Sequence, residues 1–159
     1  MKRAVVVKMR RSVNDMRLII PSKSANESYA RTAVAAFLAQ LDPTVEEISD
    51  IKTAVSEAVT NCIVHAYRET IGNIYIAIKI YDDGWASISI RDAGCGIDDI
   101  KKAMEPMYTT GGPERAGLGF AVMGSFMDKL RVRSKPGCGT TVTLEKYIEK
   151  RDRQNINEA

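Results

Sequence analysis

The stretch TVEEISDIKTAVSEAVTNCIVHAY, from Thr44 to Tyr67, decides the fold of this 159-residue chain. Thr44 and Glu47 stand in the T-x-x-E spacing of a capping box, which predicts a helix start just after the break at Asp42-Pro43. The apolar residues that follow recur every three or four positions, the period of a half-buried helix: Ile48, Ile51, Val55, Val59 and Ile63. We therefore expect one long helix from residue 44 to about residue 67.

The opposite side of this predicted helix carries polar groups. Glu57, Asn61 and His65 stand four residues apart, so their side chains stack along one face. Carboxylate and carboxamide oxygens are ligands that magnesium prefers, and magnesium commonly arrives with nucleotide phosphates. A solvated helix face has the same spacing, and a lone histidine such as His65 is more often packed or capping than catalytic. The motif therefore needs support from other parts of the chain.

The period changes from helical to strand-like after Gly72. Isoleucines alternate with other residues over 74–80 and again over 88–90, on either side of Asp83-Gly84, which predicts a β-hairpin. A short helix is predicted over 120–126, and a second hairpin from strands at 130–134 and 141–144.

Upstream of the long helix, a strand is predicted over 17–20, where Pro21 stops it. The S-x-x-E spacing of Ser24 and Glu27 predicts the start of a first helix. Its predicted apolar face consists of Tyr29, Ala33, Ala36, Phe37 and Leu41. Helices on one face of a mixed, mostly antiparallel sheet make an α+β two-layer sandwich. We expect a flexible arm over 1–15, one domain over 16–147 and a charged tail over 148–159.

Composition excludes several functional classes. The formal net charge is +3, of which the residues before Met16 carry +4, so the remainder sums to −1 and lacks the basic surface of a nucleic-acid binder. The apolar runs are too short for a membrane span, and no signal peptide is evident, which predicts a cytoplasmic protein. The three cysteines form no zinc or CxxC spacing and are expected to be free thiols: Cys62, Cys95 and Cys138.

Two glycine-rich segments follow the strands. Asp92-x-Gly94-x-Gly96 comes after a predicted strand, where the carboxylate can accept from a ligand's amine and the glycines allow close backbone approach. Alone, this pattern is also typical of a plain turn. In the segment 109–119, glycines at 111–112 and at 117 and 119 bracket Pro113-Glu114-Arg115, and the loop runs into a helix N-terminus, which favours phosphate. The Rossmann, P-loop and protein-kinase motifs are missing, so any ATP is bound in another way.

Taken in order, these pieces resemble the Bergerat ATP-binding fold of histidine-kinase ATP domains, ATP-driven heat-shock chaperones, gyrase and MutL. The matching boxes are Glu57-x-x-x-Asn61, Asp92-x-Gly94-x-Gly96, Gly117-x-Gly119 and Gly139-Thr140-Thr141. Within that superfamily the segments 26–31, 37–44, 56–61 and 120–128 resemble the anti-sigma F factor family, serine kinases of spore-forming bacteria. The resemblance covers about residues 16–147.

The resemblance implies a role for each matching residue. Asn61 is expected to hold Mg²⁺ against the phosphates, and Glu57 to act as general base. Asp92 is expected to accept from the adenine amino group, helped by the Thr140 hydroxyl. The other expected contacts with ATP or ADP are Gly94, Gly96, Thr109, Thr110, Arg115, Gly117 and Gly119. The expected contacts with partner proteins are Arg31, Glu114 and Arg115.

The activity implied by the resemblance is a nucleotide-dependent switch. With ATP, a homodimer holds a sporulation sigma factor and phosphorylates a serine of an anti-anti-sigma factor; with ADP, it binds the dephosphorylated antagonist. A nucleotide-gated binding module without kinase activity is the alternative, which retention of Glu57 disfavours. A two-component histidine kinase lacks support because no dimerisation domain with a phosphoacceptor histidine is present. A chaperone or MutL-type ATPase would need further domains for its clients.

Overall fold

A computed structural model describes residues 9–105 and 118–151. Five strands form one sheet in the order β1-β2-β3-β5-β4, and every neighbouring pair is antiparallel. The strands are Ser12–Pro21 (β1), Asn73–Tyr81 (β2), Trp85–Arg91 (β3), Lys129–Lys135 (β4) and Gly139–Tyr147 (β5). The predicted α+β sandwich is confirmed, with an antiparallel sheet where a mixed one was also allowed.

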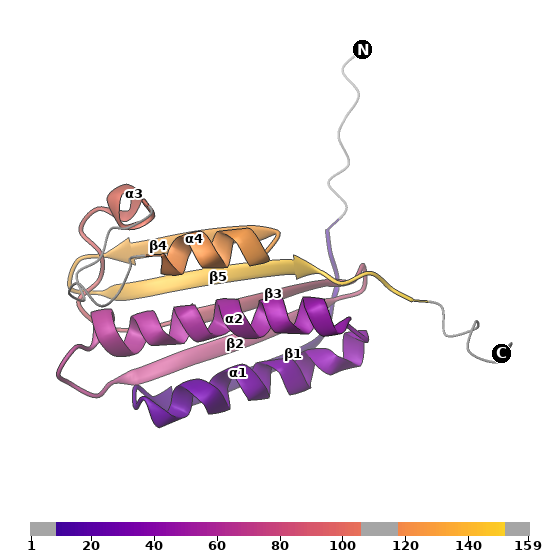
Figure 1. Cartoon of the computed structure of the whole chain (residues 1–159), viewed down its shortest axis with the longest axis horizontal. Coiled ribbons are helices and arrows are strands. Elements are labelled where there is room, and N and C mark those ends of the chain that lie inside the picture. The colour runs from indigo at the N-terminus through magenta and orange to yellow at the C-terminus, as the bar shows by residue number, and fades with distance from the viewer. Residues whose placement is uncertain (1–8, 106–117, 152–159) are drawn as a thin grey trace, which may run out of the picture.

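A layer of helices covers one face of this sheet (Figure 1). The α-helices are Ala25–Leu38 (α1), Val45–Asn61 (α2), Ile100–Ala103 (α3) and Gly119–Phe126 (α4). A 3-10 turn, Ala39–Leu41, follows α1, and a π-helical turn, Cys62–Ala66, follows α2. Helix α2 lies in the middle of the layer, between α1 and α4. None of the helices in the described residues is long and apolar enough to cross a bilayer.

The core lies between α2 and the central strands. Ile76 of β2 pairs with Ile90 of β3, and Ile78 pairs with Ile88, so these side chains share the face turned to the helices. Val55 and Val59 of α2 are fully buried against the same layer. Each such aliphatic side chain contributes about 1.5–3 kcal/mol by leaving water. The alternation and the helical stripe read from the sequence are therefore both confirmed.

The most deeply buried residues of helix α1 lie outside the predicted face, although Phe37 and Leu41 of that face pack against the core as partly buried residues. Its buried residues are Ala30, Val34 and Leu38, whereas Tyr29 is 57% exposed. Apolar residues occur on nearly every side of this helix, so periodicity alone did not identify the centre of its buried face. The predicted capping box is also wrong, because the Ser24 side chain makes no cap hydrogen bond.

The two ends of the domain are longer than predicted. Strand β1 begins at Ser12 rather than Arg17, so residues 12–15, expected in the arm, belong to the sheet. Residues 12–15 are all exposed on this edge strand, so no alternation of apolar and polar residues marks them as a strand in the sequence. At the other end, Ile148 is 1% exposed and donates its N–H to the Gly84 carbonyl at 3.0 Å. The first residues of the expected tail are therefore packed on the domain.

Candidate functional site

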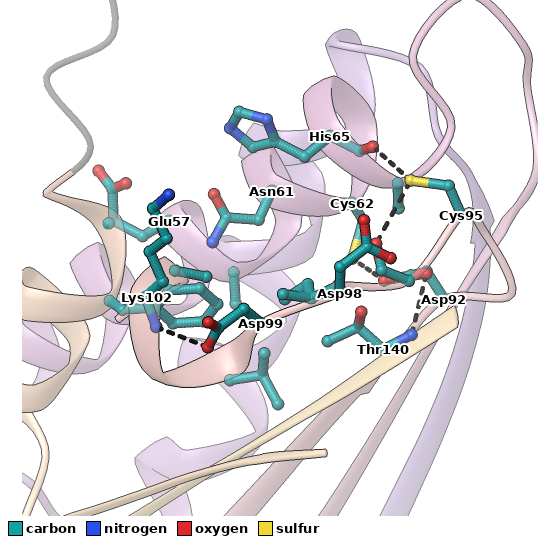
Figure 2. Close-up of a pocket in the computed structure, with 18 of the residues that line it drawn as sticks. Glu57, Asn61, Cys62, His65, Asp92, Cys95, Asp98, Asp99, Lys102 and Thr140 are labelled. Atoms are coloured by element: carbon teal, nitrogen blue, oxygen red, sulfur yellow. Dashed lines mark hydrogen bonds between the residues drawn. The ribbon is translucent and has the colours of Figure 1, made fainter. Parts of the chain in front are cut away.

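A cavity of about 640 Å³ opens beside the C-terminal half of α2. Its walls come from α2 and the π-turn, the loop after β3, helix α3, the start of α4 and the start of β5 (Figure 2). Six of the residues predicted to bind or act on a ligand line this one space: Glu57, Asn61, Asp92, Gly96, Gly119 and Thr140.

The first side of the cavity is the polar face of α2. Figure 2 shows Glu57, Asn61 and His65 in a row along the helix, as their four-residue spacing predicts. Gly119, the first residue of α4, lies directly against this row. A Cβ atom at position 119 would stand 3.2 Å from Glu57 Oε2 and 3.5 Å from the Asn61 carboxamide atoms. Glycine at this position therefore keeps the space beside both polar groups open.

The opposite side holds a buried carboxylate. Asp92 is 4% exposed, and its Oδ1 accepts from the backbone N–H of Gly94 at 2.9 Å and of Thr140 at 3.2 Å. Its Oδ2 accepts from the thiol of Cys62 at 3.7 Å. Burial raises the pKa of Asp92 above its ordinary 3.8, although these donors act in the other direction. The side chain is thus a fixed acceptor at the cavity wall.

Thr140 is oriented by a serine that the sequence analysis did not single out. Its Oγ1 lies 2.8 Å from Ser134 Oγ, and Ser134 Oγ also accepts from the N–H of Ile97 at 2.8 Å. Ser134 pairs with Thr140 in the β4–β5 register. The sequence could have indicated this role, because Ser134 is a polar residue that lies opposite Thr140 in the predicted hairpin.

The glycines of the first box pack against the protein's own backbone. A Cβ atom on Gly94 would stand 2.3 Å from the Ala66 carbonyl oxygen, and one on Gly96 would stand 2.2 Å from that of Lys135. Gly96 also has a φ of +73°, which favours glycine. These contacts account for both glycines without a ligand, and their predicted contact with a nucleotide stays a prediction.

The π-turn and the loop after β3 are bonded to each other. The Cys95 N–H donates to the Ala66 carbonyl at 3.0 Å, and the Cys95 thiol donates to the His65 carbonyl at 3.1 Å. Tyr67 accepts from the Ala93 N–H at 2.9 Å and donates to the Asn73 carbonyl at 2.5 Å. Burial raises the pKa of Tyr67. The position of Asp92 relative to α2 is therefore fixed by the backbone as well as by side chains.

Helix α3 and the two residues before it supply polar groups that the sequence analysis also missed. Asp98, Asp99 and Lys102 line the cavity, and Figure 2 shows them across from the α2 row. Asp99 caps the helix by accepting from the Lys102 N–H at 3.0 Å. The signal was an aspartate three residues before a lysine, next to a sequence of good helix formers.

The remaining predicted residues fall elsewhere. Arg31 lies on α1, does not line the cavity, and contacts Glu27 at 3.6 Å and Ser56 Oγ at 3.4 Å. In the described part of the chain no group of three His, Cys, Asp or Glu side chains could hold a metal ion. The other predicted contacts lie outside the described residues: Thr109, Thr110, Glu114, Arg115 and Gly117.

Comparisons with known proteins identify the family. The family model of the histidine kinase-like ATPase domain matches residues 20–146. The chain is 60% identical over 136 residues to the anti-sigma F factor of Caldanaerobacter subterraneus, covering 85% of this chain and 94% of the relative. It is 50% identical over 139 residues to the anti-sigma F factor of Halalkalibacterium halodurans, covering 86% of this chain and 94% of that relative.

Solved structures support the fold. The RsbU and RsbW domains of a Mycobacterium tuberculosis protein match with a TM-score of 0.65 at 21% identity, over 88% of this chain and 34% of that one. The mycobacterial sensor histidine kinase MprB matches with a TM-score of 0.53 at 14% identity, over 86% of this chain and all of that one. At these identities the likeness concerns the fold alone.

Proposed function

The chain belongs to the histidine kinase-like ATPase domain family and, within it, to the anti-sigma F factors, and we propose that it acts as an ATP-dependent serine kinase. In its ATP form it would bind and inhibit a sporulation sigma factor. It would also phosphorylate and so inactivate an anti-anti-sigma factor. We propose that it works as a homodimer in the cytoplasm.

One observation carries this proposal: a carboxylate and a carboxamide one helical turn apart, Glu57 and Asn61, share a cavity with a buried acceptor, Asp92. Asp92 presents a carboxylate oxygen to the cavity, which suits the amino group of adenine. Thr140 lies next to it. With the base held there, the phosphates would extend along α2 toward Asn61 and the space beside Gly119.

The residues near the phosphate end fit a magnesium ion delivered with the nucleotide. Magnesium prefers oxygen ligands and usually takes only one or two from the protein, with phosphates and water completing its shell. The Asn61 carboxamide, which faces the cavity, matches that requirement. The bound ion would neutralise charge that develops on the phosphates during transfer.

Glu57 would then act as the general base. It stands one helical turn from Asn61 and beside the open space at Gly119. Its carboxylate would accept the proton of an incoming serine hydroxyl while the serine oxygen bonds to the γ-phosphorus. The bond from that phosphorus to the bridging oxygen breaks, and ADP leaves with the electron pair.

The partner surface would be separate from the cavity. Arg31 is held on α1 by Glu27 and by Ser56, which directly precedes Glu57 in α2. Arg31→Ala should therefore weaken sigma-factor capture about tenfold, the effect of losing one charged contact at an interface, and leave ATP affinity unchanged. Pull-down with the sigma factor and calorimetry with Mg-ATP measure the two properties. If the wild type and Arg31→Ala capture the sigma factor equally well, Arg31 is not part of the docking surface.

The activity itself is tested by intact-mass analysis. A candidate anti-anti-sigma protein is incubated with this chain and Mg-ATP, and a gain of one phosphate on a serine is expected. A nucleotide-dependent complex without phosphate transfer would identify the alternative, a binding module that has no kinase activity. Absence of both would contradict the proposal as a whole.

A further inference from the structure

The first residue of the π-turn, Cys62, places a buried thiol between the two ends of the cavity. It is 4% exposed, lines the cavity, and directly follows Asn61 in the chain. Its thiol donates to Asp92 Oδ2, and a sulfur-to-oxygen distance of 3.7 Å is within hydrogen-bond range for this larger atom. Neither the family resemblance nor the proposed mechanism assigns a role to this side chain.

We propose that Cys62 is a positioning residue, which orients the Asp92 carboxylate toward the amino group of a bound adenine. The inference rests on the proposed nucleotide site. It adds a specificity determinant to that site, because the oriented oxygen selects ligands that carry a hydrogen-bond donor on the purine ring.

The argument starts from the acceptor capacity of the carboxylate. Each carboxylate oxygen accepts about two hydrogen bonds. Two backbone N–H groups, from Gly94 and Thr140, already occupy Oδ1. The Cys62 thiol occupies one acceptor position of Oδ2. One acceptor position of Oδ2 is left for a ligand, and the thiol determines which side of the oxygen it faces.

The thiol also links the two halves of the site. The donors to Oδ1 come from the loop after β3 and from β5, whereas the donor to Oδ2 comes from the end of helix α2. Because Cys62 and Asn61 are consecutive, a shift of the helix end moves the phosphate-side carboxamide and the base-side carboxylate together. The hydrogen bond between Cys62 and Asp92 therefore helps to set the distance between the Asn61 carboxamide and the Asp92 carboxylate.

The hydrogen bond to Asp92 Oδ2 places the proton on the Cys62 sulfur, because a carboxylate oxygen can only accept. Burial and the neighbouring Asp92 charge both raise the pKa of Cys62 well above its usual range. A protonated thiol donates to a carboxylate, and an ionised one would repel it. Cys95 and Cys138 are exposed by contrast, so reagents in solution distinguish them from Cys62.

The test compares ADP with the diphosphate of purine riboside, which lacks the 6-amino group. Calorimetry gives both affinities for the wild type, Cys62→Ala, Cys62→Ser and the exposed-site control Cys138→Ala. We expect the wild type to prefer ADP. Cys62→Ala should lower that preference about five- to tenfold, as expected for a weak donor to a charged acceptor, with affinity for the purine analogue nearly unchanged. The serine variant should restore most of the preference, and Cys138→Ala should match the wild type.

A merely structural role for Cys62 would weaken both ligands equally, and this result would overturn the inference. The infrared S–H stretch of Cys62, assigned as the band that Cys62→Ala lacks, gives a second measurement, and it should shift when ADP binds to the wild type. An unshifted band would also overturn the inference. If the wild type binds no ADP at all, both the proposed function and the role of Cys62 are wrong. If the wild type binds ADP and Cys62→Ala keeps the full preference for ADP, only the role of Cys62 is wrong.

Discussion

The two ends of helix α2 are built differently. At its N-terminus the Thr44 hydroxyl accepts from the Glu47 N–H at 3.0 Å, and the Glu47 carboxylate accepts from the Thr44 N–H at 2.7 Å. Arg151 adds an ion pair to Glu47 at 3.1 Å. At the other end Glu57 and Asn61 face a cavity, and the helix widens into a π-turn, a form often found at functional sites.

This contrast separates stability from function within one helix. Polar groups at the N-terminal end are bonded within the protein, so their removal should cost free energy of unfolding and leave ligand chemistry unchanged. Polar groups at the C-terminal end point into the cavity, so their removal should change ligand chemistry first. The buried Asp92 belongs to the second end, because Cys62 and the Ala66 carbonyl join its loop to the helix.

The largest effect is expected for Glu57→Gln. The amide keeps the shape of the side chain but cannot accept the serine proton, so transfer should fall at least about 100-fold and up to about 10,000-fold. Mg-ATP affinity should stay within about twofold, since the base does not hold the nucleotide. Phosphoserine mass analysis and calorimetry measure the two. The control is Glu46→Gln, an exposed glutamate at the N-terminal end, which should transfer normally.

The next effect is expected for Asp92→Asn, which should weaken ADP binding about 10- to 100-fold, because an amide donor can face the adenine amine. Calorimetry with ADP measures this change.

The same substitution tests the cost of burying the Asp92 charge. Burial raises the pKa of Asp92, so the ionised group opposes folding. Its favourable contribution is present below its unfolded pKa of about 3.8 and is lost as the pH rises through the raised folded pKa. Without ligand, the melting temperature of Asp92→Asn minus that of the wild type should therefore increase as the pH is raised from 4 to 7. A constant difference across this range would contradict the buried-charge argument.

At the N-terminal end, Thr44→Ala should lower the free energy of unfolding by about 1 kcal/mol, the usual cost of losing a helix cap. Denaturant titration measures this change. ADP affinity and phosphate transfer should remain at wild-type values, because residue 44 lies at the far end of the helix from the cavity. Thr44→Ser keeps the hydroxyl acceptor and serves as the matched control. A loss of ADP affinity in the alanine variant would break the division between the two ends.

The smallest effect is expected for Arg151→Ala, at about 0.5 kcal/mol, because its ion pair with Glu47 is partly exposed. Burial of Glu47 is outweighed by its hydrogen bonds with Thr44 and Arg151, which lower its pKa below 4.5. Such a carboxylate contributes stability above its unfolded pKa and loses it as the pH falls through the lowered folded pKa. The difference from wild type should thus shrink in acid and in high salt. Melting curves at two salt concentrations and at pH 3 and 7 check both.

Much of the fold follows from patterns repeated along the chain. The isoleucines of β2 and β3 and the stripe of α2 each repeat one local period several times, so a single misread residue does not change the interpretation. The N-terminus of α2 was equally accessible, because a capping box needs only residues three apart. The polar row of α2 follows from the helical period alone.

The tertiary structure decided what depends on residues far apart in sequence. Helix α1 carries apolar side chains on several faces, and only its packing beside α2 selects Ala30, Val34 and Leu38. At the failed capping box, Ser24 itself has a helical backbone conformation, and the Glu27 carboxylate accepts from Ser56 of the neighbouring helix instead. Residue types alone do not rank such competing partners.

The cavity shows the same division. Asp92, Gly94 and Gly96 were predictable as a motif, but the reason for each glycine is a backbone on another element, at Ala66 or Lys135. The bond from Cys62 to Asp92 joins residues 30 positions apart, and that from Arg151 to Glu47 joins residues 104 apart. Local periodicity determines which face of an element is apolar. The choice of partner depends on how elements pack in three dimensions, and that is set by the shape of the whole core.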